Sequence, residues 1–166
     1  IIEMDRMRKL IADHMVMSKQ TSPHVTSYVE ADVTNLVIWR NKVKSSFEKR
    51  ENEKITFTPI FIMLVAKALR EFPLLNVSID NYNIIKKKSI NVGMATALSD
   101  GNLIVPVIKN ADQKGIFEIS REIMELVKKG RDGKLKPDDM QGATFTISSL
   151  GVLGTTAFTP IINMPE

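Results

Sequence analysis

The order of segments along this 166-residue chain predicts an α/β fold, an α+β arrangement of helices packed on a mixed sheet. Three observations support this prediction. Apolar residues recur at helical spacing in four segments, and short alternating or apolar segments between them are typical of strands. No repeat, low-complexity tract or linker divides the chain. Because a chain of this length can enclose a substantial core, we expect a single domain over residues 1–166.

Helices are expected over residues 4–19, 32–52, 58–73 and 115–135, where apolar side chains return every three or four positions. The first ends before Pro23. The third has an unusually wide apolar face, which predicts deep burial.

Polar and proline residues mark where two of these helices begin and end. Asp32 or Thr34 can cap the second helix. For the third, Thr58 is the expected cap, Pro59 lies in its first turn and Pro73 ends it. The fourth has Gly130 near its end, where helices often use glycine.

Strands are expected in the remaining segments, several of which alternate polar and apolar residues. The clearest alternation lies at residues 24–33 and predicts a strand with one polar face. Further extended segments are expected over residues 75–80, 83–89, 90–98, 102–112, 144–148 and 155–166, with a turn at 80–83. Pro106 predicts an edge position or an end of pairing, because proline has no backbone N–H to donate.

Composition narrows the function classes. Apolar residues make up 43% and charged residues 25%, an ordinary soluble globular composition. The net charge of +4 is spread among acidic residues, so nucleic acid is not an expected partner. The absence of cysteine excludes disulfides and a cysteine nucleophile, and with only two histidines no metal site is expected. No apolar run is long enough to span a bilayer, and no secretion signal opens the chain.

The segment GATFTISSLGVLG, residues 142–154, is the most informative one. It predicts a strand that ends in Ser148 and Ser149, followed by a turn containing Gly151 and Gly154. The serines can be strand-end residues beside a flexible turn, or one hydroxyl can point at a reacting group. A nucleotide-binding loop is a weak alternative, because the segment lacks both a P-loop lysine and a dinucleotide fingerprint.

Several segments together resemble the catalytic domain of the dihydrolipoamide acyltransferases, the core components of 2-oxo acid dehydrogenase complexes. The resemblance rests on MDRMRKLIADHMVMSKQTSPHVT, EADVT, ALREFPLLNVSID, NVGMATALSDGNLIVPVIKNAD, GRDGKL and GATFTISSLG with FTPIINMPE, in that order over nearly the whole chain. It implies a chloramphenicol-acetyltransferase-like, coenzyme A-dependent acyltransferase fold. It also implies transfer of an acyl group between a dihydrolipoyl thiol and coenzyme A, with acetyl or branched-chain groups favoured over succinyl.

The resemblance assigns roles to four residues. Ser148 matches the serine that stabilises the tetrahedral oxyanion. Arg40, Thr56 and Ser149 match coenzyme A contacts, Arg40 facing the cofactor phosphates. Each also has a simpler interpretation, as a solvated charge on a helix or a polar residue beside a turn. One acidic position of related members is Ala97 here, which leaves that part of the coenzyme A pocket undefined.

The family's general base is a histidine in a DHR…DG motif, which this chain does not contain. His14 is expected on the surface or in packing, and His24 either in a structural role or lining the active-site channel. We therefore expect residues 1–166 to be a catalytic domain that lacks the C-terminal part with the histidine motif. By themselves they should be largely inactive.

The resemblance also implies partners. It predicts self-association into trimers and a larger cage, a lipoyl group on a separate domain, and dehydrogenase and dihydrolipoamide dehydrogenase partners bound through domains outside this chain. The expected location is the cytoplasm in a bacterium and the mitochondrial matrix in a eukaryote. The alternative function, from a different class, is a non-catalytic core or scaffold paralogue of the same fold.

Overall fold

The computed structural model describes residues 1–52, 54–98, 103–149 and 154–165. Within these ranges the four predicted helices are confirmed. They are α1 (Arg6–Thr21), α2 (Thr34–Glu51), α3 (Phe57–Glu71) and α4 (Ile116–Arg131). Short 3-10 turns, η1 (Pro73–Leu75), η2 (Ala111–Gln113) and η3 (Pro137–Asp139), connect the larger elements.

The strands form a mixed sheet and two small antiparallel pairs. They are β1 (Val77–Asp80), β2 (Asn83–Lys86), β3 (Val92–Met94), β4 (Thr96–Ala97), β5 (Leu103–Ile104), β6 (Val107–Ile108) and β7 (Phe145–Ile147). In the three-stranded sheet β3 is central, antiparallel to β6 and parallel to β7. β1 pairs with β2 across the predicted turn, and β4 pairs with β5. The predicted mixed sheet is confirmed, and Pro106 lies where β5 ends and β6 begins.

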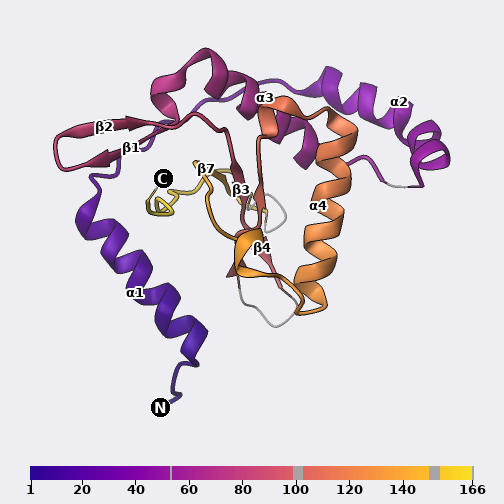
Figure 1. Cartoon of the computed structure of the whole chain (residues 1–166). Helices are drawn as coiled ribbons and strands as arrows, with labels where there is room; N and C mark the ends of the chain where they lie inside the picture. Colours follow the sequence, from indigo (N-terminus) through magenta and orange to yellow (C-terminus); the bar gives the residue numbers. More distant parts are fainter. Residues whose placement is uncertain (53, 99–102, 150–153, 166) are drawn as a thin grey trace.

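Helices α3 and α4 pack against each other and cover one face of the β6-β3-β7 sheet (Figure 1). The core joins these three layers. Its members are Ile62, Ala66 and Leu69 of α3, Ile119, Ile123 and Leu126 of α4, and Val92, Met94 and Ile108 of the strands, with Ile90 and Ala111 beside them. The predicted deep burial of α3 is confirmed for most of its apolar face, whereas Phe61 and Leu64 remain exposed.

Strand β7 uses the alternation read from its sequence. Phe145 and Ile147 pack against the core, while Thr146, between them, faces the other side of the sheet and accepts a hydrogen bond from Asn163 Nδ2 at 3.2 Å. Gly93, the β3 partner of Thr146, leaves room for the Thr146 side chain on this face of the sheet. A Cβ at Gly93 would lie 2.8 Å from Thr146 Oγ1, so any larger residue there would displace the β7 side chain.

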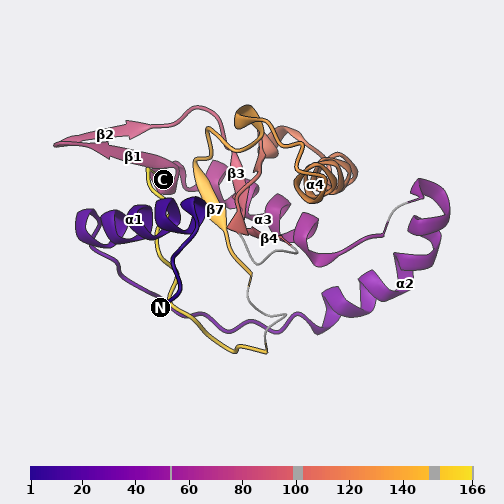
Figure 2. The same ribbon diagram turned by 90° about the horizontal axis from the view of Figure 1, so that it is seen from below.

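On the side of β7 away from α3 and α4 lie the C-terminal segment and α1 (Figure 2). The one buried residue of α1 is a serine, Ser18, which donates a 2.6 Å hydrogen bond to the carbonyl of Ile162. Residues 4–19 had the apolar spacing of a packed helix, yet Met7 and Leu10 are exposed. In the described structure α1 therefore buries little apolar surface, with Ile11 and Met15 only half-buried.

The predicted helix ends are correct to within a few residues, but some capping roles differ. The cap position of α2 is Val33, not Asp32 or Thr34 as predicted. Asp32 Oδ1 still accepts a 2.8 Å hydrogen bond from Thr34 N, and hydrogen bonding from Thr34 lowers the pKa of Asp32. The prediction that Thr58 caps α3 is wrong, because Thr56 occupies that position and its side chain makes no capping bond. At the end of α4 the left-handed conformation belongs to Gly133, with φ of 65°, and not to Gly130.

The strand predicted over residues 24–33 is wrong. These residues form no ladder in the described structure, and Val25 and Val29 are each 91% exposed. Extended backbone becomes a strand only beside a partner, and no neighbouring segment of the described chain supplies one. Residues 155–165 likewise run without a ladder.

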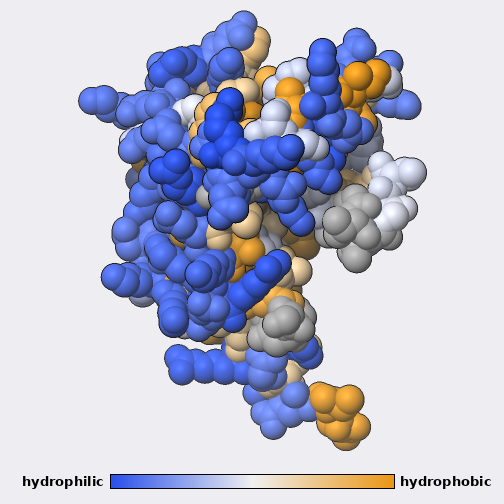
Figure 3. Space-filling model, turned by 90° about the vertical axis from the view of Figure 1, so that its right-hand side faces the viewer, coloured by the Kyte–Doolittle hydropathy of each residue, from blue (hydrophilic) through white to orange (hydrophobic). Residues whose placement is uncertain are grey.

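The side of the molecule that carries α2 and α4 is mostly hydrophilic, with separate apolar patches (Figure 3). Of the stripe predicted on α2, only Phe47 is buried, and its ring stacks on Phe117 of α4 at 5.2 Å. Trp39 is 45% exposed. Among the described helices, none is both long enough and apolar enough to cross a membrane.

Shortening a core side chain of α4 should lower the free energy of unfolding substantially. Ile119 is fully buried between α3 and the sheet, so Ile119→Ala is expected to lower the free energy of unfolding by about 2–5 kcal/mol. Met124→Ala on the same helix, where the side chain is 48% exposed, serves as the control and should cost far less. Urea unfolding of both variants measures the difference. Equal losses would show that α4 does not pack as described.

Candidate active site

Ser148 and Ser149 directly follow β7, and both are exposed. The strand carries them away from the core, and no described residue bonds to the hydroxyl of Ser148. That hydroxyl is therefore free to donate to a ligand. Gly151 of the predicted turn lies outside the described residues, whereas Gly154 has a φ of 73°, a conformation that favours glycine.

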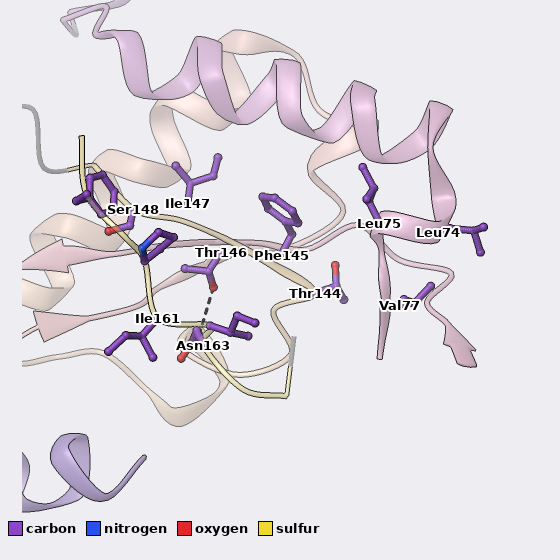
Figure 4. A pocket seen from close by; sticks show the side chains of 13 residues that line it. Leu74, Leu75, Val77, Thr144, Phe145, Thr146, Ile147, Ser148, Ile161 and Asn163 are labelled. Carbon is purple, nitrogen blue, oxygen red and sulfur yellow. Dashed lines mark hydrogen bonds between the residues drawn. The ribbon is translucent and has the colours of Figure 1, made fainter. Parts of the chain in front are cut away.

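Ser148 lines a pocket of about 640 Å³ beside β7 (Figure 4). One wall is the η1–β1 region, the floor is β7 with its flanks, and the opposite wall is the C-terminal segment. The lining residues are Leu74, Leu75 and Val77, residues 144–148, and Phe158, Pro160, Ile161, Ile162 and Asn163. Most of these side chains are apolar. The few polar groups, on Thr144, Thr146, Ser148 and Asn163, are the ones that can orient a ligand by hydrogen bonding.

A second pocket, of about 380 Å³, also includes Ser148. Its other walls are more polar and come from residues 27–29, from Ser149 and from residues 155–158. Ser148 therefore lies where an apolar pocket and a hydroxyl-rich pocket adjoin. Two reactants entering from different sides could both reach its hydroxyl.

Arg40 and Thr56 line neither of these pockets but lie close to one another. Arg40 Nε donates to the carbonyl of Ile55 at 3.1 Å, and the guanidinium lies 5.2 Å from the ring centroid of Phe57. These contacts hold Arg40 beside the first residue of α3, next to Thr56. The guanidinium also donates to Asn41 Oδ1 at 3.1 Å, and no carboxylate of the described chain forms an ion pair with it.

The two histidines are held by backbone groups. His24 Nε2 accepts from Ile162 N at 2.9 Å, and Nδ1 lies 2.7 Å from the carbonyl of Ser22. His14 Nε2 lies 3.2 Å from the carbonyl of Met164. Neither histidine lines a pocket that contains Ser148. Of the two expectations for His24, lining the channel and supporting structure, its contacts in this chain fit the second.

Ala97 is exposed on β4, paired with Leu103 of β5, and offers no functional group where related members have an acid. The described residues contain no group of three or more side chains suited to holding a metal ion.

Sequence reasoning missed the pocket wall formed by residues 158–163. Asn163, which bonds to Thr146, was not expected to take part, because the resemblance that FTPIINMPE supports assigned no role to its residues. Only the tertiary placement of the segment beside β7 identifies it.

Comparisons with known proteins identify the family of the chain. The model of the 2-oxoacid dehydrogenases acyltransferase catalytic domain matches residues 1–166. The lipoamide acyltransferase component of the Bacillus subtilis branched-chain alpha-keto acid dehydrogenase complex is 48% identical over 159 residues, which are 96% of this chain and 37% of that protein. The dihydrolipoyllysine-residue acetyltransferase component of the Cupriavidus necator pyruvate dehydrogenase complex is 47% identical, over 98% of this chain and 29% of that protein. The chain thus spans about a third of the length of these relatives.

Solved structures agree in fold. A probable dihydrolipoamide acetyltransferase from Listeria monocytogenes superposes with a TM-score of 0.96 at 48% identity, over 100% of this chain and 70% of that one. A structure of Azotobacter vinelandii dihydrolipoamide acetyltransferase, studied for the roles of a serine, a histidine and an asparagine in catalysis, gives 0.94 at 42% identity, over 100% and 68%. These matches confirm the expected coenzyme A-dependent acyltransferase fold. With the family model matching from end to end, the chain belongs to the 2-oxoacid dehydrogenase acyltransferase family, in the region of its catalytic domain.

Proposed function

We propose that residues 1–166 are part of the catalytic domain of a dihydrolipoamide acyltransferase, which moves an acyl group between a dihydrolipoyl thiol and coenzyme A. The observation that carries the proposal is the position of Ser148. It is exposed, it bonds to no other described residue, and it lies where two pockets of different character adjoin. A transfer between two thiols needs such a place, because both substrates must meet at one carbonyl.

In this reaction the attacking thiol gives up its proton and its sulfur forms a bond to the thioester carbonyl. The carbonyl oxygen becomes an oxyanion, to which the hydroxyl of Ser148 donates a hydrogen bond. When the intermediate collapses, the original carbon–sulfur bond breaks and the leaving thiolate takes up a proton. Ser148 therefore stabilises charge and forms no covalent bond to the substrate.

The proton of the attacking thiol requires a base, and we propose that this base comes from outside residues 1–166. Both ring nitrogens of His24 are engaged with backbone groups, and His14 is directed at Met164. The chemistry studied in the Azotobacter enzyme includes a histidine as well as a serine, which supports a pairing of Ser148 with a histidine that this chain does not carry.

Coenzyme A is proposed to bind partly at the start of α3. Helix N-termini favour phosphate groups because their first N–H groups are unpaired. Arg40 lies beside this terminus and has no ion pair among the described residues, and Thr56 is exposed at its cap without a capping bond. Ser149, in the more polar pocket, is the proposed contact nearer the thiol end.

Arg40→Ala is expected to raise the KM for coenzyme A about 10-fold or more and leave kcat nearly unchanged, because a charge-assisted phosphate contact is lost. Arg50→Ala is the matched control. Arg50 also lies on α2 and over a phenylalanine ring, at 5.3 Å from Phe117, but it is paired with Glu51. Both KM values are measured by steady-state kinetics on the parent protein, by which we mean the longer protein that we propose contains residues 1–166. A collapse of kcat at unchanged KM in Arg40→Ala would exclude the assignment.

We further propose that the parent protein self-associates into trimers and a larger cage, and that it acts beside dehydrogenase and dihydrolipoamide dehydrogenase components. One solved relative, at 41% identity and a TM-score of 0.94, is the cubic core of a pyruvate dehydrogenase multienzyme complex, over 100% of this chain and 68% of that one. Because the curated relatives include both acetyl- and branched-chain-type components at similar identity, either acyl group remains in the proposal.

The test is acyl transfer by the parent protein from acyl-coenzyme A to dihydrolipoamide, followed by thioester absorbance. Transfer with acetyl- or branched-chain acyl-coenzyme A supports the proposal. A parent protein that assembles into a core but transfers neither group would be the non-catalytic scaffold paralogue instead.

A further inference from the structure

The second half of α1 and the residues directly after it contact the C-terminal segment through four side chains. Ser18 Oγ donates to the carbonyl of Ile162 at 2.6 Å, and His24 Nε2 accepts from the N–H of the same residue at 2.9 Å. Two residues after Ile162, the carbonyl of Met164 lies 3.2 Å from His14 Nε2, and the sulfur of Met164 accepts a hydrogen bond from Ser22 Oγ at 3.1 Å. Both backbone groups of Ile162 are thus held by residues about 140 positions earlier in the chain.

The contacts of His24 define its protonation. The backbone N–H of Ile162 can only donate, so Nε2 must present a lone pair. Nδ1 lies 2.7 Å from the carbonyl of Ser22, which can only accept, so Nδ1 must carry the proton. His24 is therefore a neutral imidazole protonated at Nδ1, and it bridges two backbone groups.

The segment that His24 holds is the wall of the pocket that contains Ser148. Ile161, Ile162 and Asn163 line this pocket beside β7. Asn163 Nδ2 also donates to Thr146 Oγ1 at 3.2 Å, two residues before Ser148 (Figure 4). The wall is thus fixed on one side by His24 and Ser18, and on the other by the strand that ends at Ser148.

We infer that His24 is a positioning residue for the acyl transfer: by holding the N–H of Ile162 it sets the distance between the pocket wall and Ser148. The inference rests on the proposed function of Ser148. His24 lines neither of the two pockets that contain Ser148, so its effect on the reaction passes through the backbone of Ile162. A displacement of about 1 Å in a reactive site can lower the rate about 100-fold. Loss of the one hydrogen bond that places Ile162 can therefore have a large effect on kcat.

Two substitutions test whether the hydrogen bond from Ile162 N–H to position 24 matters, or only the presence of a polar side chain there. His24→Asn keeps an amide nitrogen near the position of Nδ1, able to donate to Ser22, but is too short to accept from Ile162. His24→Gln extends an amide oxygen to the region of Nε2 and can restore that acceptor. In the parent protein we expect kcat to fall about 10- to 100-fold in His24→Asn, and to stay within about 3-fold of the wild type in His24→Gln. The KM for coenzyme A should change in neither.

Two measurements do not depend on activity. Hydrogen exchange at the Ile162 amide should accelerate in His24→Asn and not in His24→Gln. The ¹⁵N chemical shifts of the wild-type imidazole should report the proton on Nδ1. If His24→Asn fails to fold, these shifts and the His24→Gln variant still decide the question, because a proton on Nε2 or a slow His24→Gln enzyme contradicts the bridge.

Equal kcat values for His24→Asn and the wild type, in an active parent protein, would overturn the positioning role and leave the proposed function intact. If kcat fell equally in His24→Asn and His24→Gln, and thermal stability fell equally as well, His24 would only support the structure and would not position the pocket wall. A wild-type parent protein without any acyl transfer would overturn the proposed function itself, and with it the catalytic part of this inference.

Discussion

Ser148→Ala in the parent protein is expected to lower kcat about 100- to 1,000-fold, which corresponds to about 2.7–4 kcal/mol of lost transition-state stabilisation. The hydroxyl donates to the oxyanion, which exists only in the intermediate and in the transition states beside it. Ground-state binding of either thiol should therefore change little, and both KM values should stay close to those of the wild type. The measurement is steady-state acyl transfer with each substrate varied in turn.

Ser149→Ala is the matched control for this experiment. It removes a hydroxyl from the next position, in a side chain that is also exposed but lines only the more polar of the two pockets. We expect this variant to affect the KM for coenzyme A and to retain most of its kcat. If Ser148→Ala kept a kcat within about 3-fold of the wild type, Ser148 would not be the oxyanion donor.

Residues 1–166 by themselves should turn over about 100- to 10,000-fold more slowly than the parent protein, which is the contribution expected of a positioned base. A thiol with a pKa near 8.5, the ordinary value for a cysteine-like thiol, is mostly protonated at neutral pH. Neither His14 nor His24 is placed to take that proton, because both are directed at backbone groups. The measurement compares kcat for the two forms in the same transfer assay.

Two controls separate a missing base from a damaged fold. Far-UV circular dichroism should show that residues 1–166 retain their helices. Replacing only the histidine of the expected DHR…DG motif in the parent protein should reproduce most of the loss. Full turnover by residues 1–166 would mean that the chemistry resides in groups other than those proposed.

The sequence by itself determined the local elements of this protein. The helices α3 and α4 follow from apolar residues at a spacing of three to four, with Pro59 and Pro73 at the limits of α3. Strand β7 follows from the alternation at residues 144–148, which places Phe145 and Ile147 on the core face. These features depend on side chains close together in the chain, so periodicity is enough to predict them.

The resemblance to the acyltransferases identified Ser148, Arg40, Thr56 and Ser149 as candidates, but it did not place them. In the described structure Arg40 and Thr56 meet at the start of α3, whereas Ser148 and Ser149 lie at the end of β7, and neither of the two pockets at Ser148 joins the two pairs. Whether they act together is part of the proposal tested above.

Only the tertiary structure decided which extended segments became strands and which contacts formed the site. Residues 24–33 alternate more clearly than β3 does, yet β3 is a strand because β6 and β7 lie on both sides of it. Likewise nothing near His24 in the sequence points to Ile162, and nothing near Asn163 points to Thr146. The physical reason is that backbone hydrogen bonds between distant segments depend on which partner the fold brings within about 3 Å, and a local pattern does not contain that information.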